Sequence, residues 1–279
     1  MAAMRQRIQI CCIAIGLFCA LFAATALQQN LTVRRYTVSN EKLQGSIHIA
    51  LLTDLHSVYY GSDQKVLLDA VAAAQPDLVF LVGDIVDDVA PCDGAEALLE
   101  ALGARYQCYY VSGNHEFWSK NIDKIKRKIR DCGITVLEGE QKKICLDGQN
   151  ITICGVDDPE INAYTSDPDA WRTQLFRCAE SVNETDFTIL LSHRPEYAEL
   201  YGMLGFDLTL CGHAHGGQVR IPGVLNGLLA PNQGFFPAYA GGEYLVGEEN
   251  KQTMIVSRGL VRNFLPRIFN PPELVVIKL

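Results

Sequence analysis

The chain of 279 residues has a mass of 30.8 kDa and is 48% hydrophobic, 9% aromatic and 20% charged. This composition excludes disordered, collagen-like and disulfide-dense proteins and is typical of one globular domain or two small ones. The 24 basic and 32 acidic residues give a net charge of −8. Because no basic cluster offsets this acidic charge, we expect no nucleic-acid binding.

An apolar segment lies near the start of the chain. Residues 10–27 carry no charge and approach the ~20 residues needed to span a bilayer, and Arg5 and Arg7 precede them. This order predicts a signal anchor or signal peptide over 1–27, with its N-terminus in the cytoplasm. Ala24-Thr25-Ala26 fits a cleavage site. The sequence therefore predicts an extracytoplasmic domain, held in the cell membrane by a single N-terminal pass or secreted if the leader is cleaved.

A linker is expected over 28–45, and the rest of the chain, 46–279, alternates short β-branched apolar runs with helical patterns. This alternation predicts a layered α/β domain. The expected strands cover 47–52, 78–82, 108–111, 135–137, 151–156, 188–191, 208–210, 243–246, 253–256 and 274–279. The expected helices cover 63–74, 95–102, 119–131 and 169–181. The sequence shows no internal repeat, so we predict one domain with two sheets.

The ten cysteines predict no disulfide framework. Three lie in the N-terminal apolar segment, and the other seven are odd in number, form no C-x-x-C pair and mostly lie within apolar runs. Cysteine usage therefore does not decide on which side of a membrane the domain lies.

Five of the six histidines directly follow predicted strands, in segments rich in Asp, Asn and Gly. The segments are Asp54-Leu55-His56, Gly83-Asp84, Gly113-Asn114-His115-Glu116, His193 and Gly212-His213-Ala214-His215. In an extended chain, the side chains of Asp54 and His56 point the same way and can share an ion. Because binding sites are built from loops at strand ends, these segments predict one shared site.

The residue types in these segments indicate which ions the site holds. Carboxylates, an amide and imidazoles without thiolates suit Mn²⁺, Fe²⁺, Zn²⁺ or Mg²⁺ and disfavour a structural zinc site made of thiolates. A single ion that keeps one position open for a substrate would leave some of these ligand groups unused. Two divalent ions bridged by one carboxylate use them all, and such a pair suits in-line displacement at phosphorus.

In this order, the motifs resemble the full set of the calcineurin-like metallophosphoesterases and span residues 54–215. The N-terminal segment, the Gly-Gly-Gln that follows His215, and the stretches 257–259 and 270–273 resemble the membrane-associated YkuE/YaeI-like branch of that family. The resemblance implies the metallophosphoesterase fold, a two-sheet β-sandwich flanked by helices.

The resemblance also implies a role for each matching residue. One ion would be held by Asp54, His56 and His215, the other by Asn114, His193 and His213, with Asp84 bridging both. His115 would bind no metal and would stabilise the phosphoryl group or protonate the leaving oxygen. A metal-bridging hydroxide would attack phosphorus in line, without a covalent enzyme intermediate.

Six further residues have two interpretations each. Asp87 and Asp88 orient a ligand imidazole or cap a helix. Asp157 and Asp158 line the cleft or form an Asx-Pro turn. Arg194 and Arg258 contact a substrate phosphate or lie on the surface.

The sequence thus predicts a phosphodiesterase or phosphatase that depends on two metal ions. A UDP-2,3-diacylglucosamine-type pyrophosphatase is an alternative, because an anchor confines enzyme and lipid-linked nucleotide to one surface. The apolar loops 221–231 and 234–237 are candidates for a lipid-facing lip, or else pack as aromatic turns. A protein phosphatase is disfavoured by the signal segment. A noncatalytic membrane-tethered metal-binding protein is disfavoured because every motif position is filled.

Overall fold

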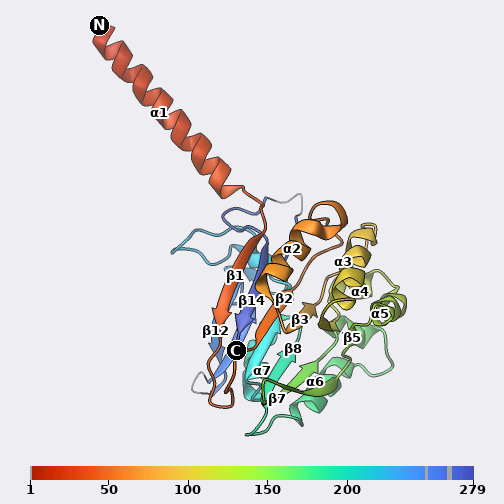
Figure 1. Cartoon of the computed structure of the whole chain (residues 1–279). Coiled ribbons are helices and arrows are strands. Elements are labelled where there is room, and N and C mark those ends of the chain that lie inside the picture. Colours follow the sequence, from red (N-terminus) through yellow and green to blue (C-terminus); the bar gives the residue numbers. More distant parts are fainter. Residues whose placement is uncertain (1, 249–250, 263–265) are drawn as a thin grey trace.

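The computed structural model describes residues 2–248, 251–262 and 266–279. Its first element, α1 (Ala2–Ala26), projects from the folded domain as one straight helix, drawn in red in Figure 1. Its segment Met4–Ala26 is long and apolar enough to cross a membrane, and no part of its apolar window is buried against the rest of the chain. The expected apolar N-terminal helix is therefore present, and no protein surface buries the side chains of its apolar window.

The first sheet contains six strands in the order β1-β14-β2-β3-β4-β5. Their bounds are β1 (Thr32–Thr37), β14 (Glu273–Lys278), β2 (His48–Leu52), β3 (Leu78–Val82), β4 (Gln107–Val111) and β5 (Thr135–Val136). Neighbours pair in parallel except β14 and β2, which are antiparallel. The carboxyl ends of β2, β3 and β4 therefore lie at one edge of this sheet.

The second sheet also contains six strands, in the order β12-β13-β9-β8-β7-β6. Their bounds are β12 (Gly242–Val246), β13 (Gln252–Val256), β9 (Leu208–Cys211), β8 (Phe187–Leu191), β7 (Gln149–Gly155) and β6 (Glu140–Leu146). The four central strands are parallel, and both outer pairs are antiparallel. A short hairpin of β10 (Leu229–Ala230) and β11 (Gly234–Phe235) lies outside both sheets.

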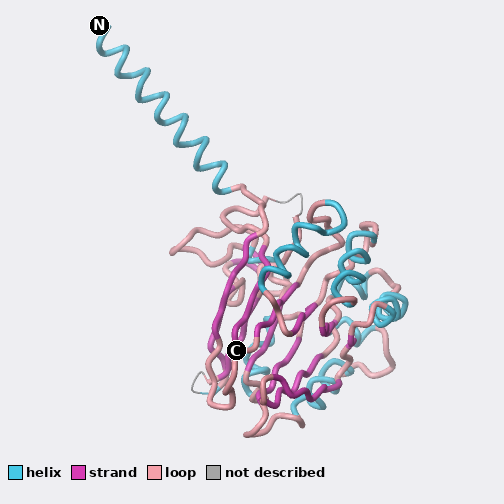
Figure 2. The backbone as a smooth tube through the Cα atoms, in the orientation of Figure 1, coloured by secondary structure: helices cyan, strands magenta, loops and turns pink. Residues whose placement is uncertain are grey.

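Helices flank the two sheets on their outer sides, and the strands occupy the centre of the domain (Figure 2). The helices are α2 (Lys65–Ala74), α3 (Asp93–Gly103), α4 (Asn114–Trp118), α5 (Ile122–Asp131), α6 (Ala170–Ala179) and α7 (Ala198–Met203). Short 3₁₀ turns cover Ser62–Gln64, Pro159–Ala163, Pro195–Tyr197 and His215–Gly217. This arrangement confirms the predicted two-sheet sandwich with helices on its outer faces.

The core consists of three apolar layers. The central layer joins the inner faces of the sheets through side chains such as Phe80 and Ile153, both fully buried. Leu67 belongs to the layer between the first sheet and its helices, and Leu175 to the layer between the second sheet and its helices. Each such side chain contributes about 1.5–3 kcal/mol by leaving water. The three layers hold the strand ends of both sheets rigidly.

Two expectations need correction. The segment 28–45 is not a free linker throughout, because β1 pairs with β14 over the six residues Thr32–Thr37. The helix expected over 119–131 begins at Ile122, because a separate helix, α4, precedes it. The sequence analysis also missed β6 (Glu140–Leu146), an edge strand whose mostly exposed, polar side chains do not give the apolar alternation of a half-buried strand.

Candidate metal centre

The five predicted segments meet where the carboxyl ends of strands from both sheets lie close together. Asp54 and His56 follow β2, Asp84 follows β3, and Asn114 and His115 begin α4 directly after β4. His193 follows β8, and His213 and His215 follow β9. The parallel pairing within each sheet directs these ends to one edge, so residues up to 161 positions apart contribute to one cluster.

The backbone at these strand ends is not extended. Asp54 and His56 have φ values of 51° and 48°, and Asp84, His213 and His215 have φ values of 53°, 64° and 48°. The expected extended backbone at Asp54 and His56 is therefore wrong, although their side chains still meet in one group, as predicted. The left-handed conformation costs a non-glycine residue about 1–2 kcal/mol, and such strain is concentrated at functional sites.

One group of ligand-type side chains consists of Asp54, His56 and His215. Their carboxylate and imidazole atoms all lie within 4.8 Å of one another. The Asp54 Oδ1 atom lies 4.0 Å from His215 Nε2 and also accepts a hydrogen bond from the backbone N–H of His213 at 2.9 Å. The second oxygen of Asp54 is buried and has no hydrogen-bond partner among the described residues.

The second group consists of Asp84, His193 and His213, again with ligand atoms within 4.8 Å of one another. Asp84 Oδ2 lies 3.1 Å from His193 Nε2 and 3.7 Å from His56 Nε2. Asp84 therefore lies between the two groups, and its other oxygen accepts a hydrogen bond from the backbone N–H of His115 at 2.9 Å.

Unpaired atoms test whether these residues suit metal ions. Among the described residues, seven site side chains each keep one buried nitrogen or oxygen outside any regular hydrogen bond. These atoms are Asp54 Oδ2, His56 Nε2, Asp84 Oδ2, Asn114 Oδ1, His193 Nε2, His213 Nδ1 and His215 Nδ1. A buried polar atom without a partner is costly. Its concentration in one cluster of carboxylate, amide and imidazole groups fits hard or borderline divalent cations.

The other nitrogen of three imidazoles is held by a partner that orients the ring. His56 Nδ1 lies 3.0 Å from Asp87 Oδ2, His193 Nδ1 lies 2.9 Å from the Val82 carbonyl, and His213 Nε2 lies 2.8 Å from Asn232 Oδ1. These oxygens accept hydrogen bonds from the rings, so the other nitrogen of each ring, the one that a metal ion would bind, is turned toward the cluster. Asp87 thus orients an imidazole, the first of its two predicted roles.

His115 lies at the exposed rim of the cluster. Its Nδ1 atom is 2.6 Å from Asp88 Oδ1, and its ring centroid lies 4.3 Å from that of His56. Its side chain is 24% exposed, compared with 8% for His56 and none for His193. His115 is therefore the imidazole of the site that a substrate in solution can reach most easily, and Asp88 fixes its orientation.

The electrostatic environment shifts the pKa values of the site imidazoles in opposite directions. Burial lowers the pKa of His193, but the charges of Asp84 and Asp54 outweigh burial and raise that pKa to about 10. Burial, together with the charges of His193 and Arg194, lowers the pKa of His213 to about 3. Burial and the charge of His56 likewise hold the pKa of His215 well below its ordinary value. At neutral pH, His213 and His215 are already in the ligand form, whereas His193 must release a proton before it binds a metal.

Glu116 lies within the predicted Gly113-Asn114-His115-Glu116 motif, and the sequence predicts no role for it. The fully buried Glu116 carboxylate accepts backbone hydrogen bonds from Asp84 and Gly113 through Oε2, and from Ile85 and Val86 through Oε1. This single side chain therefore ties the Asp84 loop to the start of α4. Nothing in the sequence pattern distinguishes it from a helix N-terminal acidic residue, such as Glu in a capping box.

Two glycines permit the close approach of the loops. A Cβ atom at Gly113 would lie 2.2 Å from Asp84 Oδ1, and one at Gly83 would lie 2.3 Å from His193 Nδ1. Gly83 also has a φ of +76°, a region that side chains disfavour. Any larger residue at either position would displace a ligand-type side chain.

The remaining candidates make buried structural contacts. Asp157 Oδ1 accepts from Ser112 Oγ at 2.6 Å and lies 2.6 Å from Lys126 Nζ. Asp158 accepts from Arg194 at 2.6 and 2.9 Å and also from the Glu160 backbone, as an Asx-Pro turn requires. Arg194 is therefore neither a surface residue nor a free phosphate ligand, and its Nη1 atom lies 3.2 Å from His213 Nε2.

Comparison with known proteins gives the family. The sequence matches the family model described as Calcineurin-like phosphoesterase over residues 47–217. A Campylobacter jejuni protein named "Uncharacterized metallophosphoesterase Cj0846" is 29% identical, with 88% of this chain and 63% of that protein covered. The Bacillus subtilis protein "Uncharacterized metallophosphoesterase YkuE" is 29% identical, with 83% and 78% covered. The Bos taurus protein "Transmembrane protein with metallophosphoesterase domain" is 30% identical, with 67% and 44% covered.

The chain therefore spans less than two thirds of the Campylobacter and bovine relatives. The similarity to YkuE confirms the resemblance drawn from the motifs. Because the family model matches more than half of the residues, the chain belongs to the calcineurin-like phosphoesterases, a family of metal-dependent phosphoester hydrolases.

Proposed function

We propose that this protein is a phosphodiesterase or phosphatase that uses two divalent ions held around Asp84. The observation that carries this proposal is the set of seven buried, unpaired ligand atoms described above, which belong to side chains at five strand ends. Six of these side chains, all except Asn114, lie in clusters of ligand groups. Asp54, His56 and His215 hold one ion, and Asn114, His193 and His213 hold the other. Asp84 is the residue shared by both.

When bound, two divalent ions supply an acidified water as the nucleophile and neutralise charge on the phosphoryl oxygens. The chain's own residues position these components. Asp87, the Val82 carbonyl and Asn232 fix the rings of His56, His193 and His213. The shared carboxylate of Asp84 keeps the two ligand groups adjacent, so one phosphoryl group can contact both.

His115 is proposed as the catalytic residue that contacts the substrate. Asp88 accepts the hydrogen bond from its Nδ1, so Nε2 is free to face the phosphoryl group. In this position, an imidazolium stabilises negative charge on the phosphoryl oxygens and donates its proton to the leaving oxygen. We find no need for a nucleophilic side chain in this proposal.

The decisive experiment uses the full chain in a neutral detergent with added Mn²⁺. Hydrolysis of bis-p-nitrophenyl phosphate and p-nitrophenyl phosphate is measured beside an Asp84→Asn variant, which keeps the shape of the side chain. We expect cleavage that requires metal and is lost in the variant. Activity that is equal in the two proteins would refute the role of Asp84, and metal-independent activity would refute the proposed chemistry.

We further propose that α1 anchors the domain in the cell membrane with the domain outside the cytoplasm. Three observations support this proposal: the uncovered apolar helix, Arg5 and Arg7 in its first turns before the uncharged segment, and the bovine relative named as a transmembrane protein. A membrane-impermeant maleimide should label the exposed Cys92 and Cys145 in intact cells. Labelling of these cysteines only after lysis would place the domain inside.

A second candidate substrate is a lipid-linked nucleotide, cleaved at its pyrophosphate as in a UDP-2,3-diacylglucosamine-type pyrophosphatase. Phe235 and Phe236, 70% and 69% exposed, favour an amphiphilic substrate. The two rings contact each other, with their centroids 6.5 Å apart, and still present most of their surface to solvent. Release of UMP from UDP-2,3-diacylglucosamine, with little turnover of either p-nitrophenyl ester, would favour this candidate over a general phosphoesterase.

A further inference from the structure

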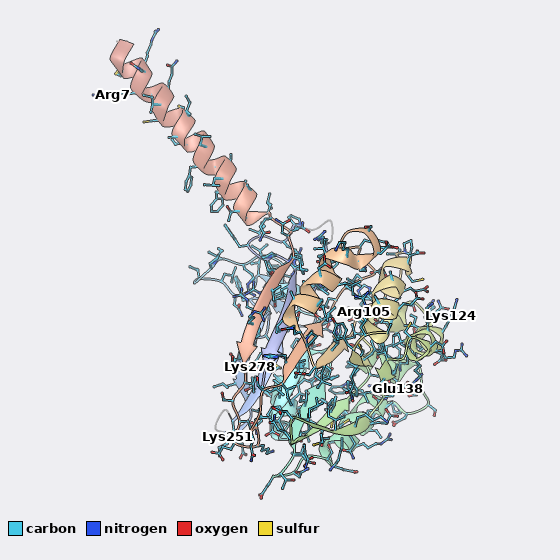
Figure 3. The ribbon with its side chains drawn as sticks, viewed as in Figure 1. Arg7, Arg105, Lys124, Glu138, Lys251 and Lys278 are labelled. Carbon is cyan, nitrogen blue, oxygen red and sulfur yellow. The ribbon has the colours of Figure 1, made fainter. Side chains whose placement is uncertain are left out.

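A pocket lies outside the metal centre, beside the end of α1. It encloses about 570 Å³, and its lining includes three arginines, Arg34, Arg220 and Arg258, together with Phe269 and Pro271. Phe269 connects the pocket to α1. Its backbone N–H donates to the Ala26 carbonyl at 2.7 Å, and its ring lies 5.3 Å from that of Phe22. The pocket is therefore located where the apolar helix enters the domain, whereas Arg7 lies near the far end of that helix (Figure 3).

The positive charge of this pocket is only partly balanced. Glu273 supplies a carboxylate whose Oε2 lies 3.4 Å from Arg258 Nε and 4.0 Å from Arg34 Nε. Arg220 instead donates to neutral acceptors, the Gly216 carbonyl and Asn226 Oδ1. Among the described residues, three guanidinium groups therefore face one carboxylate. Within the described part of the chain, Arg258 Nε is also a buried atom without a hydrogen-bond partner.

Repulsion between these like charges affects the pKa of Arg220. Burial, followed by the charge of Arg258, lowers the pKa of Arg220 to about 10. An anion placed between these side chains would relieve that repulsion and accept their free N–H groups. Guanidinium groups bind phosphate with paired, charge-assisted hydrogen bonds, so the chemistry of the lining selects a phosphate ester.

The rim of the same pocket is apolar. Ile221, Val224 and Leu225 line it, and Val224 is 82% exposed. The loops that carry these residues lie between β9 and β12, at the end of the domain from which α1 projects (Figure 1). A phosphate-selective floor with an exposed apolar rim matches a lipid, whose head group is charged and whose acyl chains are not.

We propose that this pocket binds the head-group phosphate of an anionic phospholipid in the bilayer that holds α1. The proposal rests on the membrane anchoring proposed above and not on the hydrolytic reaction. Arg34, Arg220 and Arg258 hold the phosphate, while Ile221 and Val224 enter the acyl region. The bound lipid fixes the domain against the membrane surface, so that the domain does not swing freely about the end of α1.

The test measures lipid binding by the full chain in a neutral detergent. Its melting temperature is followed while short-chain dihexanoyl phosphatidylglycerol, dihexanoyl phosphatidylcholine or inorganic phosphate is added, each in the presence of EDTA. A ligand that binds only the folded protein raises the melting temperature with concentration. We expect stabilisation by phosphatidylglycerol, weaker stabilisation by phosphatidylcholine, and little effect of inorganic phosphate at equal concentration.

Variants assign the effect to the pocket. Arg220→Gln should weaken phosphatidylglycerol binding about tenfold or more, since it removes a charge-assisted contact. Arg34→Gln should weaken it as well, and because half of the Arg34 side chain is exposed, this change leaves the core intact. Arg35→Gln is the matched control, because the next residue of β1 points to the opposite face of the strand.

Two results would overturn the proposal. One is equal phosphatidylglycerol affinity in the Arg34, Arg220 and Arg35 variants. The other is inorganic phosphate that binds as tightly as the lipid and depends on the same arginines, which would make the pocket a site for a soluble anion. Since EDTA abolishes metal-dependent hydrolysis, neither result depends on whether the proposed hydrolase activity is correct.

Discussion

The two halves of the proposed metal centre contain similar residues in opposite electrostatic surroundings. The half made by Asp54, His56 and His215 has a carboxylate among its ligands, and a further carboxylate, Asp87, holds the His56 ring. The other half, for which we proposed Asn114, His193 and His213, has only amide and imidazole ligands apart from the shared Asp84. There the backbone carbonyl of Val82 and the amide of Asn232 hold the rings.

The cationic side chain of Arg194 increases this electrostatic difference between the two halves. Arg194 lies 3.2 Å from His213, and its charge contributes to the low pKa of that imidazole. In the other half, burial lowers the pKa of His56, but the hydrogen bond to Asp87 and the charges of Asp84 and Asp54 outweigh burial and raise it. Since opposite charges attract more strongly in a buried site than in water, the Asp54 half should retain its ion more tightly than the His213 half.

Replacing Asp84, which the two halves share, should have the largest effect on metal content and turnover. Asp84→Asn should lower the metal content of both halves and reduce the turnover number by more than about 10³-fold, beyond the loss of a single transition-state contact. Elemental analysis of the purified protein, beside kinetic measurements, checks this. An unchanged metal content would contradict the bridging role.

Removing the His115 side chain, which belongs to neither half, should leave the difference in ion retention between the two halves unchanged. His115→Ala should keep both ions and slow turnover by about 10²–10⁴-fold, the usual contribution of a positioned acid or base. The measurement pairs metal content with the turnover number. Loss of metal in this variant would mean that His115 is a ligand.

Changing the ring-holding residues separately should distinguish the halves. Asp87→Asn should weaken one ion and Asn232→Ala the other, each by about 10–100-fold, since residues behind the ligands typically contribute this much. Stepwise removal of metal with a competing chelator should show the weaker, His213-side ion leaving first in the wild-type protein. Asp87→Asn should narrow the gap between the two steps, and Asn232→Ala should widen it.

The two halves should also differ in how their metal affinity depends on pH, and this effect should be smaller than that of the substitutions above. His193 has a pKa raised to about 10, so it is protonated at neutral pH and an incoming ion must displace that proton. The affinity of the His193 side should therefore rise about tenfold per pH unit while the pH stays below that pKa. Calorimetric titration in two buffers of different ionisation enthalpy should show release of about one proton; release of none would refute this assignment.

The sign of the matching stability effect follows from the same raised pKa. In the metal-free protein, the His193 charge stabilises the fold fully below the ordinary histidine pKa near 6.5. That contribution is lost as the pH rises through about 10. A melting temperature of the metal-free protein that rises between these limits would contradict the assignment.

Most of the layered fold was predictable because buried parallel strands have a clear sequence pattern. β3 (Leu78–Val82) matches its predicted bounds, since five consecutive apolar residues suit a strand covered on both faces. β1 (Thr32–Thr37) was missed because its side chains are largely exposed and its partner β14 is far away in the chain. Local periodicity contains no information about such a distant pairing.

The sequence by itself determined which groups are available at the strand ends. An apolar strand followed by Asp, Asn or His brings a polar side chain to the edge of a sheet, and this local pattern is readable at each of the five segments. It also determined that the N-terminal helix is apolar, since composition alone decides that property.

Only the tertiary structure decided which of these groups face one another and what supports them. Glu116 gained its role because the turn after β3 directs the backbone N–H groups of Ile85 and Val86 toward its carboxylate. Asn232 reaches His213 from a loop 19 residues further along the chain. Arg34 lines the same pocket as Arg220 because β1 pairs with β14 at the edge of the first sheet. These contacts depend on directions and distances in space, which residue spacing along a chain does not specify.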